Sequence, residues 1–213
     1  MSGIAQPMFP LQSAPLPGET LPLRIFEPRY ARLVQDCLAA ADPVFGVVLI
    51  SRGREVGGGD ARSEVGTMVR IAEHADLGMG QYQLLAPVGE RIRVRRWLPD
   101  DPYPRAVIEP WPDEPGPPVG PEEIGVVVDR ILALYRRVAE ARGGRLRPDA
   151  LAVDAGTADD PSRHLFALAA RVPMGQADRY AVLAAPSLAE RVAVLTDAID
   201  TVTAMVEFQL SEE

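Results

Sequence analysis

Residues 112–121 read PDEPGPPVGP, and this segment divides the 213-residue chain into two parts of different character. Half of the segment is proline, which cannot continue a helix or serve in a central strand because it lacks the amide donor. We therefore predict a semi-rigid, proline-rich linker at residues 112–121. It separates residues 1–111, where short apolar runs alternate with Gly, Pro and Asp, from residues 122–213, which carry long helical patterns.

Residues 1–111 are predicted to form mainly short strands. The apolar or alternating segments that indicate them are 8–11, 44–50, 65–71, 81–88, 91–95 and 105–108. Six short strands separated by turn signals favour a small barrel or a sandwich. One helix is expected to interrupt them between Pro28 and Ala40, where apolar residues recur at helical spacing.

Residues 122–213 are predicted to form four amphipathic helices that pack as a bundle. The expected helices cover 122–142, a stretch that starts after Asp160, 176–184, and a long stretch that ends near Leu210. Ser187 and Glu190 have the spacing of a capping box at the start of the last helix. The polar segment 143–159 is expected to be a loop, to which we assign no function. The fold class is therefore α+β.

All 22 basic residues are arginine, because the sequence contains no lysine. A Walker A phosphate loop, a Schiff base and a Ser-Lys hydrolytic dyad each require a lysine. The sequence thus excludes these three kinds of enzyme, and we expect a protein without catalytic activity.

The net charge of −8 argues against nucleic acid and anionic lipid as partners, and neither half of the chain is basic. The single cysteine, Cys37, cannot form an internal disulfide and suits a reducing compartment. We find no signal peptide and no apolar run long enough to cross a membrane. We therefore expect a cytoplasmic protein that does not associate with membranes; its oligomeric state is left open.

No residues indicate a cofactor or a metal site. His74 and His164 are far apart in sequence and are expected to be solvated or capping side chains. Cys37 lies on the apolar face of its predicted helix and is expected to be core. The run Gly57-Gly58-Gly59 precedes a strand rather than a helix, so we interpret it as an inter-strand loop and not as a dinucleotide motif.

Leu77 and Met79 lie in a glycine-flanked hairpin tip, where their own hairpin does not bury them. Exposed Leu and Met side chains on such a tip can contact apolar segments of a partner. Together with Tyr82, they are our candidate polypeptide-binding residues. The alternative is that the tip packs back on the rest of the protein.

Arg91, Arg93 and Arg95 alternate along one predicted strand and are our candidate nucleic-acid-binding residues. The alternative is a solvated strand face whose arginines pair with acids on neighbouring strands. The acidic balance of this half of the chain favours that alternative.

Several segments resemble the N-terminal substrate-binding domain of the Lon protease family. They are Phe9-Pro10-Leu11, LPLRIFEPRY at 21–30, Val65-Gly66-Thr67, GERIRV at 89–94, and the helical stretch 176–191. The resemblance implies a PUA-like pseudo-barrel followed by a helical bundle, and a role in recognising unfolded or partner polypeptides in protein quality control. Without lysine, no catalytic residue of the protease carries over, so the chain is similar to stand-alone members that keep only the recognition domain.

The most specific matched residues also have a structural explanation. Glu27 complements the macrodipole at the start of the predicted helix. Phe26 and Tyr30 have i, i+4 spacing and are expected to pin that helix to the barrel. The leading hypothesis is a non-catalytic polypeptide-binding module. The alternative is an RNA-binding PUA-like module that uses the Arg91, Arg93 and Arg95 face.

Overall fold

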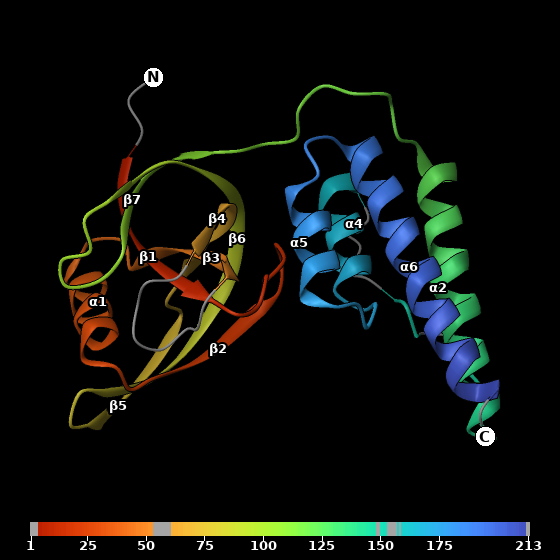
Figure 1. Ribbon diagram of the computed structural model, residues 1–213, viewed down its shortest axis with the longest axis horizontal. Coiled ribbons are helices and arrows are strands. Elements are labelled where there is room, and N and C mark those ends of the chain that lie inside the picture. Colours follow the sequence, from red (N-terminus) through yellow and green to blue (C-terminus); the bar gives the residue numbers. More distant parts are fainter. Residues whose placement is uncertain (1–3, 53–60, 148–149, 153–156, 158, 212–213) are drawn as a thin grey trace. The chain divides into compact units, whose positions relative to one another are not determined.

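The computed structural model describes residues 4–52, 61–147, 150–152, 157 and 159–211 (Figure 1). The chain divides into two compact units, Met1–Pro112 and Asp113–Glu213. The glycine run at 57–59 and part of the predicted loop at 143–159 lie outside the described residues. Most of the proline-rich segment falls in the second unit, where the Glu114 amide donates a 2.8 Å hydrogen bond to the Pro186 carbonyl.

The first unit is a seven-stranded sheet with one helix. Its strands are β1 (Ile4–Leu11), β2 (Thr20–Ile25), β3 (Val44–Arg52), β4 (Ala61–Arg70), β5 (Glu73–Gly78), β6 (Gln81–Leu98) and β7 (Arg105–Pro110), and α1 (Pro28–Ala39) lies between β2 and β3. Strand pairing runs from β6 through β4, β3, β1 and β7 and back to β6, which makes a closed circuit. Strands β2 and β5 pair instead with the first half of β6, one on each side (Figure 1).

The two strands predicted at 81–88 and 91–95 are one continuous strand, β6. Its register with β4 shifts by one residue, since Thr67 lies opposite Arg91 but Val69 lies opposite Val88. The extra residue is taken up in β6 around Gly89 as a bulge, which bends a strand without ending it. The bulge separates the half of β6 that pairs with β2 and β5 from the half that pairs with β7.

Strands β2 and β5 were not among the predicted strands. Pro22 and Arg24 interrupt the apolar pattern of β2, and every residue of β5 is exposed. Both strands depend on pairing with β6, which a local pattern does not reveal.

Two apolar clusters form the interior of the first unit. Beneath α1, the Phe9 ring lies 4.1 Å from the Tyr30 ring and 6.2 Å from the Phe45 ring, between centroids. Inside the closed circuit lies a second cluster, which we call the inner cluster: Met8, Val48, Ile92, Val94, Ala106 and Ile108. Gly66 of the matched Val-Gly-Thr segment is fixed by close packing, because a Cβ there would lie 2.1 Å from the Val47 carbonyl oxygen.

The second unit contains four helices within its described residues. They are α2 (Pro121–Ala141), α4 (Pro161–Ala169), α5 (Gln176–Ala184) and α6 (Leu188–Ser211). Helices α2 and α6 run parallel, with an ion pair of 2.5 Å between Arg130 and Asp200 and another of 2.7 Å between Arg137 and Glu207. The interior between the helices is apolar and includes Val127, Ile131, Leu165, Leu168 and Leu195.

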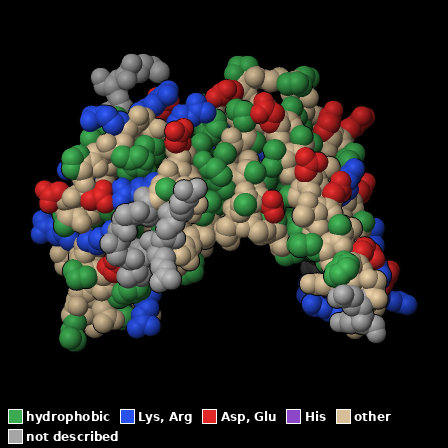
Figure 2. All heavy atoms as spheres, in the orientation of Figure 1, with side chains coloured by type: hydrophobic (Ala, Val, Ile, Leu, Met, Phe, Trp, Pro, Cys, Tyr) green, Lys and Arg blue, Asp and Glu red, His purple; other side chains and the backbone are tan. Residues whose placement is uncertain are grey.

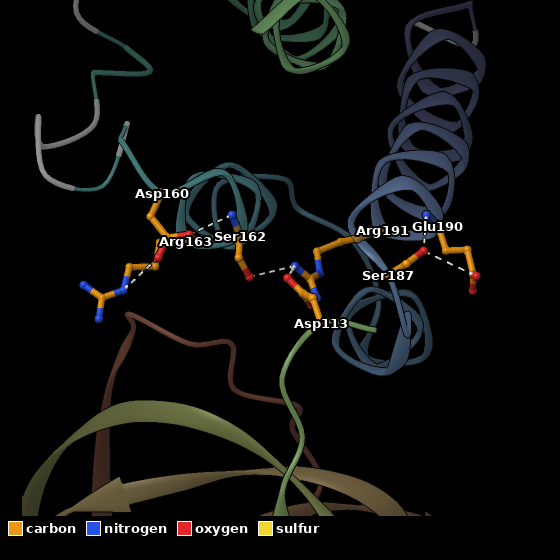
Figure 3. Close-up of polar contacts among 7 residues, drawn as sticks. All are labelled: Asp113, Asp160, Ser162, Arg163, Ser187, Glu190 and Arg191. Carbon is orange, nitrogen blue, oxygen red and sulfur yellow. Dashed lines mark hydrogen bonds and ion pairs between the residues drawn. The ribbon is translucent and has the colours of Figure 1, made fainter. Parts of the chain in front are cut away.

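The helix starts follow the capping chemistry expected from the sequence. The Asp160 carboxylate accepts hydrogen bonds from the Ser162 and Arg163 amides at 3.0 and 3.2 Å. The Ser187 hydroxyl accepts one from the Glu190 amide at 3.3 Å. These polar contacts appear in Figure 3.

Arg191 lies at the centre of the polar contacts in Figure 3 and is fully buried. Its Nη1 donates to Ser162 Oγ at 3.0 Å and to Asp113 Oδ2 at 3.2 Å, and its Nη2 donates to the other oxygen of Asp113. The guanidinium also lies 4.0 Å from the centroid of the Phe166 ring. This arginine therefore joins the start of the proline-rich segment to α4 and α6.

Replacing Gly66 by alanine is expected to cost about 2 kcal/mol or more of unfolding free energy, because the new methyl group meets backbone rather than a flexible side chain. Gly125→Ala is the matched control, since a Cβ at this position in α2 meets nothing within 4 Å. It is expected to stabilise the protein by about 0.5–1 kcal/mol, because alanine is the better helix former. Urea denaturation of both variants measures the difference, and a neutral Gly66→Ala variant would contradict this packing.

Asp113→Ala is expected to destabilise the second unit by roughly 3 kcal/mol, because it leaves the buried Arg191 guanidinium without its carboxylate partner. The control is Asp197→Ala, an exposed acid of α6, which should change stability by less than about 0.5 kcal/mol. Equal effects of the two substitutions in thermal unfolding would show that the contact with Arg191 is dispensable.

Candidate functional site

The hairpin between β5 and β6 ends in an exposed apolar tip formed by Leu77 and Met79. The Leu77 side chain is 49% exposed and that of Met79 is 99% exposed. The tip does not pack back on the first unit, which was one of the two forms of the alternative interpretation. Figure 2 shows hydrophobic side chains at the far end of this hairpin, at the lower left of the view.

Met79 adopts a backbone conformation that favours glycine. Its φ is 54°, between Gly78 at 80° and Gly80 at 74°, so three consecutive residues are left-handed. The turn is stabilised by a 2.8 Å hydrogen bond from the Gly78 amide to Asp76 Oδ1. A bulky apolar side chain costs about 1–2 kcal/mol in this conformation relative to glycine. The chain therefore holds an exposed methionine at a position where folding alone favours glycine or asparagine.

The outer face of β2, β6 and β5 extends the apolar surface away from the tip. In the register of these strands, Pro22 lies opposite Leu85, and Leu85 lies opposite Glu73. Leu85 is 39% exposed, Ala75 follows Glu73 at the alternate position of β5, and the exposed Leu77 lies at the register shift between Asp76 and Gly78. A shallow groove of about 500 Å³ runs over this face, and the polar Arg24, Glu73 and Gln83 line it beside the apolar Pro22, Ala75 and Leu85. We call Pro22, Ala75, Leu85, Leu77 and Met79 the outer apolar face.

Phe26 adds a large aromatic side chain directly after β2. The sequence predicted that Phe26 and Tyr30 pin α1 to the sheet, but only Tyr30 is buried, and Phe26 is 58% exposed. The role expected of Phe26 is therefore wrong. Glu27 and Arg29 do organise the helix start, since Arg29 Nε donates to Glu27 Oε2 at 3.1 Å and its guanidinium lies 4.4 Å from the Tyr30 ring centroid.

Tyr82 points into the core rather than toward solvent. It is only 7% exposed and belongs to the cluster beneath α1. Its hydroxyl oxygen accepts a 3.2 Å hydrogen bond from Gln35 Nε2 of α1. Alternation along β6 explains this, because Tyr82 and Leu84 face the core while Gln83 and Leu85 face outward. Tyr82 thus holds the hairpin to α1, and Leu85 is the residue of β6 that offers apolar surface.

The three arginines that are candidates for nucleic-acid binding all contact other side chains of this protein. Arg91 is buried, and its guanidinium lies 4.4 Å from the Trp111 ring centroid; that of Arg93 lies 4.0 Å from the same centroid. Arg95 is exposed and forms an ion pair with Glu109 of β7. Stacking on an indole and pairing with a cross-strand acid are the interactions of a structural arginine face.

The described residues contain no arrangement for metal binding. No group of three or more His, Cys, Asp or Glu side chains among them lies close enough to hold an ion. His74 lines the groove of the outer apolar face, whereas His164 lies on α4 in the other unit. Cys37 is buried, and burial first, then the negative charge of Asp36, raises the pKa of its thiol to about 12. A thiol with this pKa is not an activated nucleophile near neutral pH.

Comparison with known proteins assigns the family. The family model described as the ATP-dependent protease La (LON) substrate-binding domain matches residues 5–201, and the chain belongs to this family. The Lon protease of Roseiflexus castenholzii is 26% identical to it over 186 residues. This match covers 87% of the chain but 22% of that protease, so the chain spans about a fifth of its relative.

Two solved structures share the fold. A Lon N-terminal domain protein from Xanthomonas campestris is 26% identical, with a TM-score of 0.65 over 91% of this chain and 98% of that one. The N-terminal domain of a Lon protease from the Mycobacterium avium complex is 15% identical, with a TM-score of 0.60 over 92% of this chain and 98% of that one.

Among the described residues, none of the helices has both the length and the apolar character that a membrane span requires.

The sequence indicated one part of the outer apolar face and missed the other. The glycines on either side of Met79 are the local signal that predicted an exposed tip. Leu85 was missed because it looks like a core residue in an apolar segment. Only the register of β2 and β6, which puts Leu85 and Pro22 side by side on the outside, separates Leu85 from its buried neighbours.

Proposed function

We propose that this protein is a non-catalytic module that binds exposed apolar segments of unfolded polypeptides through the outer apolar face. The observation that carries the proposal is the fully exposed Met79, held in a left-handed turn at the end of a face that also exposes Leu77 and Leu85. Membership of the LON substrate-binding family supports a substrate-binding role.

The chemistry of the outer apolar face suits many different segments. Methionine is unbranched and polarisable, so it adapts to different apolar partners. Strands β2 and β5 each pair with β6 alone among the described strands, so each leaves one edge of backbone donors and acceptors available. An extended polypeptide can pair with such an edge while its side chains rest on the apolar face. This mode uses backbone hydrogen bonds for affinity and requires no specific sequence.

The fold that the sequence predicted is compatible with this function. We take the closed circuit of β6, β4, β3, β1 and β7 to be a PUA-like pseudo-barrel, and the four helices of the second unit to be a bundle. We keep the boundaries 1–111, 112–121 and 122–213 as pseudo-barrel, linker and bundle. The role of Asp113 as a partner of Arg191 supports a linker that is fixed at its start.

We infer the biological setting from membership of the LON substrate-binding family and from the single cysteine, Cys37. A substrate-recognition module related to Lon protease fits protein quality control, with unfolded proteins as partners. The unpaired, buried Cys37 suits the reducing cytoplasm. RNA binding is not carried forward, because the arginines on which it rested stack on Trp111 or pair with Glu109.

The test is the binding of fluorescein-labelled β-casein, an unfolded polypeptide, measured by fluorescence anisotropy. The double variant Leu77→Ser, Met79→Asn removes the exposed apolar tip and places a residue that tolerates φ above zero in the turn. Because a buried Leu or Met side chain contributes about 1.5–3 kcal/mol, we expect the dissociation constant to rise at least tenfold. The melting temperature should not fall.

The matched control is the double variant Met205→Ser, Phe208→Ser, which removes exposed apolar side chains from α6 in the other unit. This control is expected to bind β-casein as the unchanged protein does. Equal affinity of all three proteins would rule out the outer apolar face as the binding surface, and no binding at all at high micromolar concentration would rule out the proposed function.

A further inference from the structure

A second groove lies at one end of the closed circuit of strands. It has a volume of about 510 Å³, within the range of ligand-binding cavities. Its walls come from the first residues of β1 and β3, the last residues of β4 and β7, and the middle of β6. It shares no lining residue with the groove of the outer apolar face. The two grooves are therefore separate features of the same unit.

The floor of this end groove is apolar and leads to the inner cluster. Ile92 and Ile108 line the groove and also belong to the inner cluster, and Met68 packs against that cluster. The bulge in β6 is part of the wall, because Gly89 and Glu90 both line the groove opposite Met68. A bulge redirects side chains at the rim of a barrel, and here it puts a carboxylate beside an apolar floor.

The rim of the end groove carries an excess of negative charge. Asp42 and Arg70 form a bidentate ion pair there, with Nη2 and Oδ2 3.1 Å apart, and so neutralise one another. The Glu90 side chain is exposed and makes no hydrogen bond or ion pair within the described part of the chain. Among the described residues that line the groove, the Glu90 carboxylate is therefore the one whose charge is not balanced by an arginine.

We propose that the end groove is a second subsite for polypeptide, which takes an apolar side chain whose neighbour in sequence is positively charged. This inference rests on the proposed polypeptide-binding function and adds a preference to it. The apolar side chain occupies the floor formed by Met68, Ile92 and Ile108, and the adjacent Arg or Lys pairs with Glu90. The net charge of −8 favours the approach of the same basic segments. A nucleic acid does not suit this groove, because its phosphates would face a carboxylate.

The test compares three fluorescein-labelled peptides of equal length that share one central Leu-Phe pair. The flanking residues are Arg in the first peptide, Gln in the second and Glu in the third. Because an exposed ion pair is weak, we expect the Arg peptide to bind about threefold to fivefold more tightly than the Gln peptide at low salt. The Glu peptide should bind more weakly than both, and the differences should shrink at high salt.

Glu90→Gln is the decisive variant, since it removes the charge and keeps the shape of the side chain. We expect it to abolish the difference between the Arg and Gln peptides. Glu64→Gln is the matched control, because Glu64 is an exposed acid of β4 that does not line the groove. It should leave the difference unchanged. NMR should also show that the Arg peptide shifts the methyl signals of Ile92 and Ile108.

The outcomes separate this inference from the proposed function. The inference about the end groove would be overturned if the charge preference survives Glu90→Gln, or if the methyl signals of Ile92 and Ile108 do not move. Neither result would contradict binding at the hairpin tip. A second outcome is that Leu77→Ser, Met79→Asn does not change the affinity for β-casein but the preference for the Arg peptide disappears in Glu90→Gln. This outcome would support the end groove as a binding site and rule out the outer apolar face. Tighter binding of the Glu peptide than of the Arg peptide would also overturn the inference.

Discussion

The hydrogen bonding of β6 is the constraint on which the first unit depends. This strand has 18 residues and pairs with β2, β5, β4 and β7. It therefore belongs both to the closed circuit and to the three strands β2, β6 and β5 that carry the outer apolar face. The bulge at Gly89 allows both, because it bends the strand between its two sets of partners. The two proposed binding surfaces follow from the same strand. Leu85, on the first half of β6, lies on the outer apolar face, and Glu90, beside the bulge, lies on the rim of the end groove.

Local sequence patterns identified the elements whose formation depends on local chemistry. The starts of α4 and α6 were evident from Asp160 and Ser187, because a cap is a contact between residues near in sequence. Strands β2 and β5 and the continuity of β6 were not evident, because they depend on partners far along the chain. The burial or exposure of a side chain also depends on residues far along the chain. For this reason the role predicted for Phe26 was wrong and the buried position of Tyr82 was not foreseen. The glycines beside Met79 act locally, and the exposed tip could accordingly be predicted.

The chain combines exposed apolar side chains with polar groups that are engaged in structural contacts. Arg91 and Arg93 stack on Trp111, Arg191 joins Asp113 to two helices, and the Cys37 thiol is buried with a raised pKa. Groups held in this way stabilise a fold and are poorly placed to act on a substrate. The exposed tip of the β5–β6 hairpin is apolar and adaptable, and a surface of this kind accommodates differing apolar segments. Membership of the LON substrate-binding family agrees with this interpretation.

We propose that unfolded polypeptide contacts the tip of the β5–β6 hairpin. The most direct measurement is a methyl NMR titration of the whole chain with unlabelled β-casein. Contact at the tip should shift or broaden the methyl signals of Met79, Leu77 and Leu85 at the lowest β-casein concentrations, while those of buried Leu33 and Leu165 should not change. Changes confined to the helices of the second unit, with the Met79 signal unmoved at saturation, would contradict it.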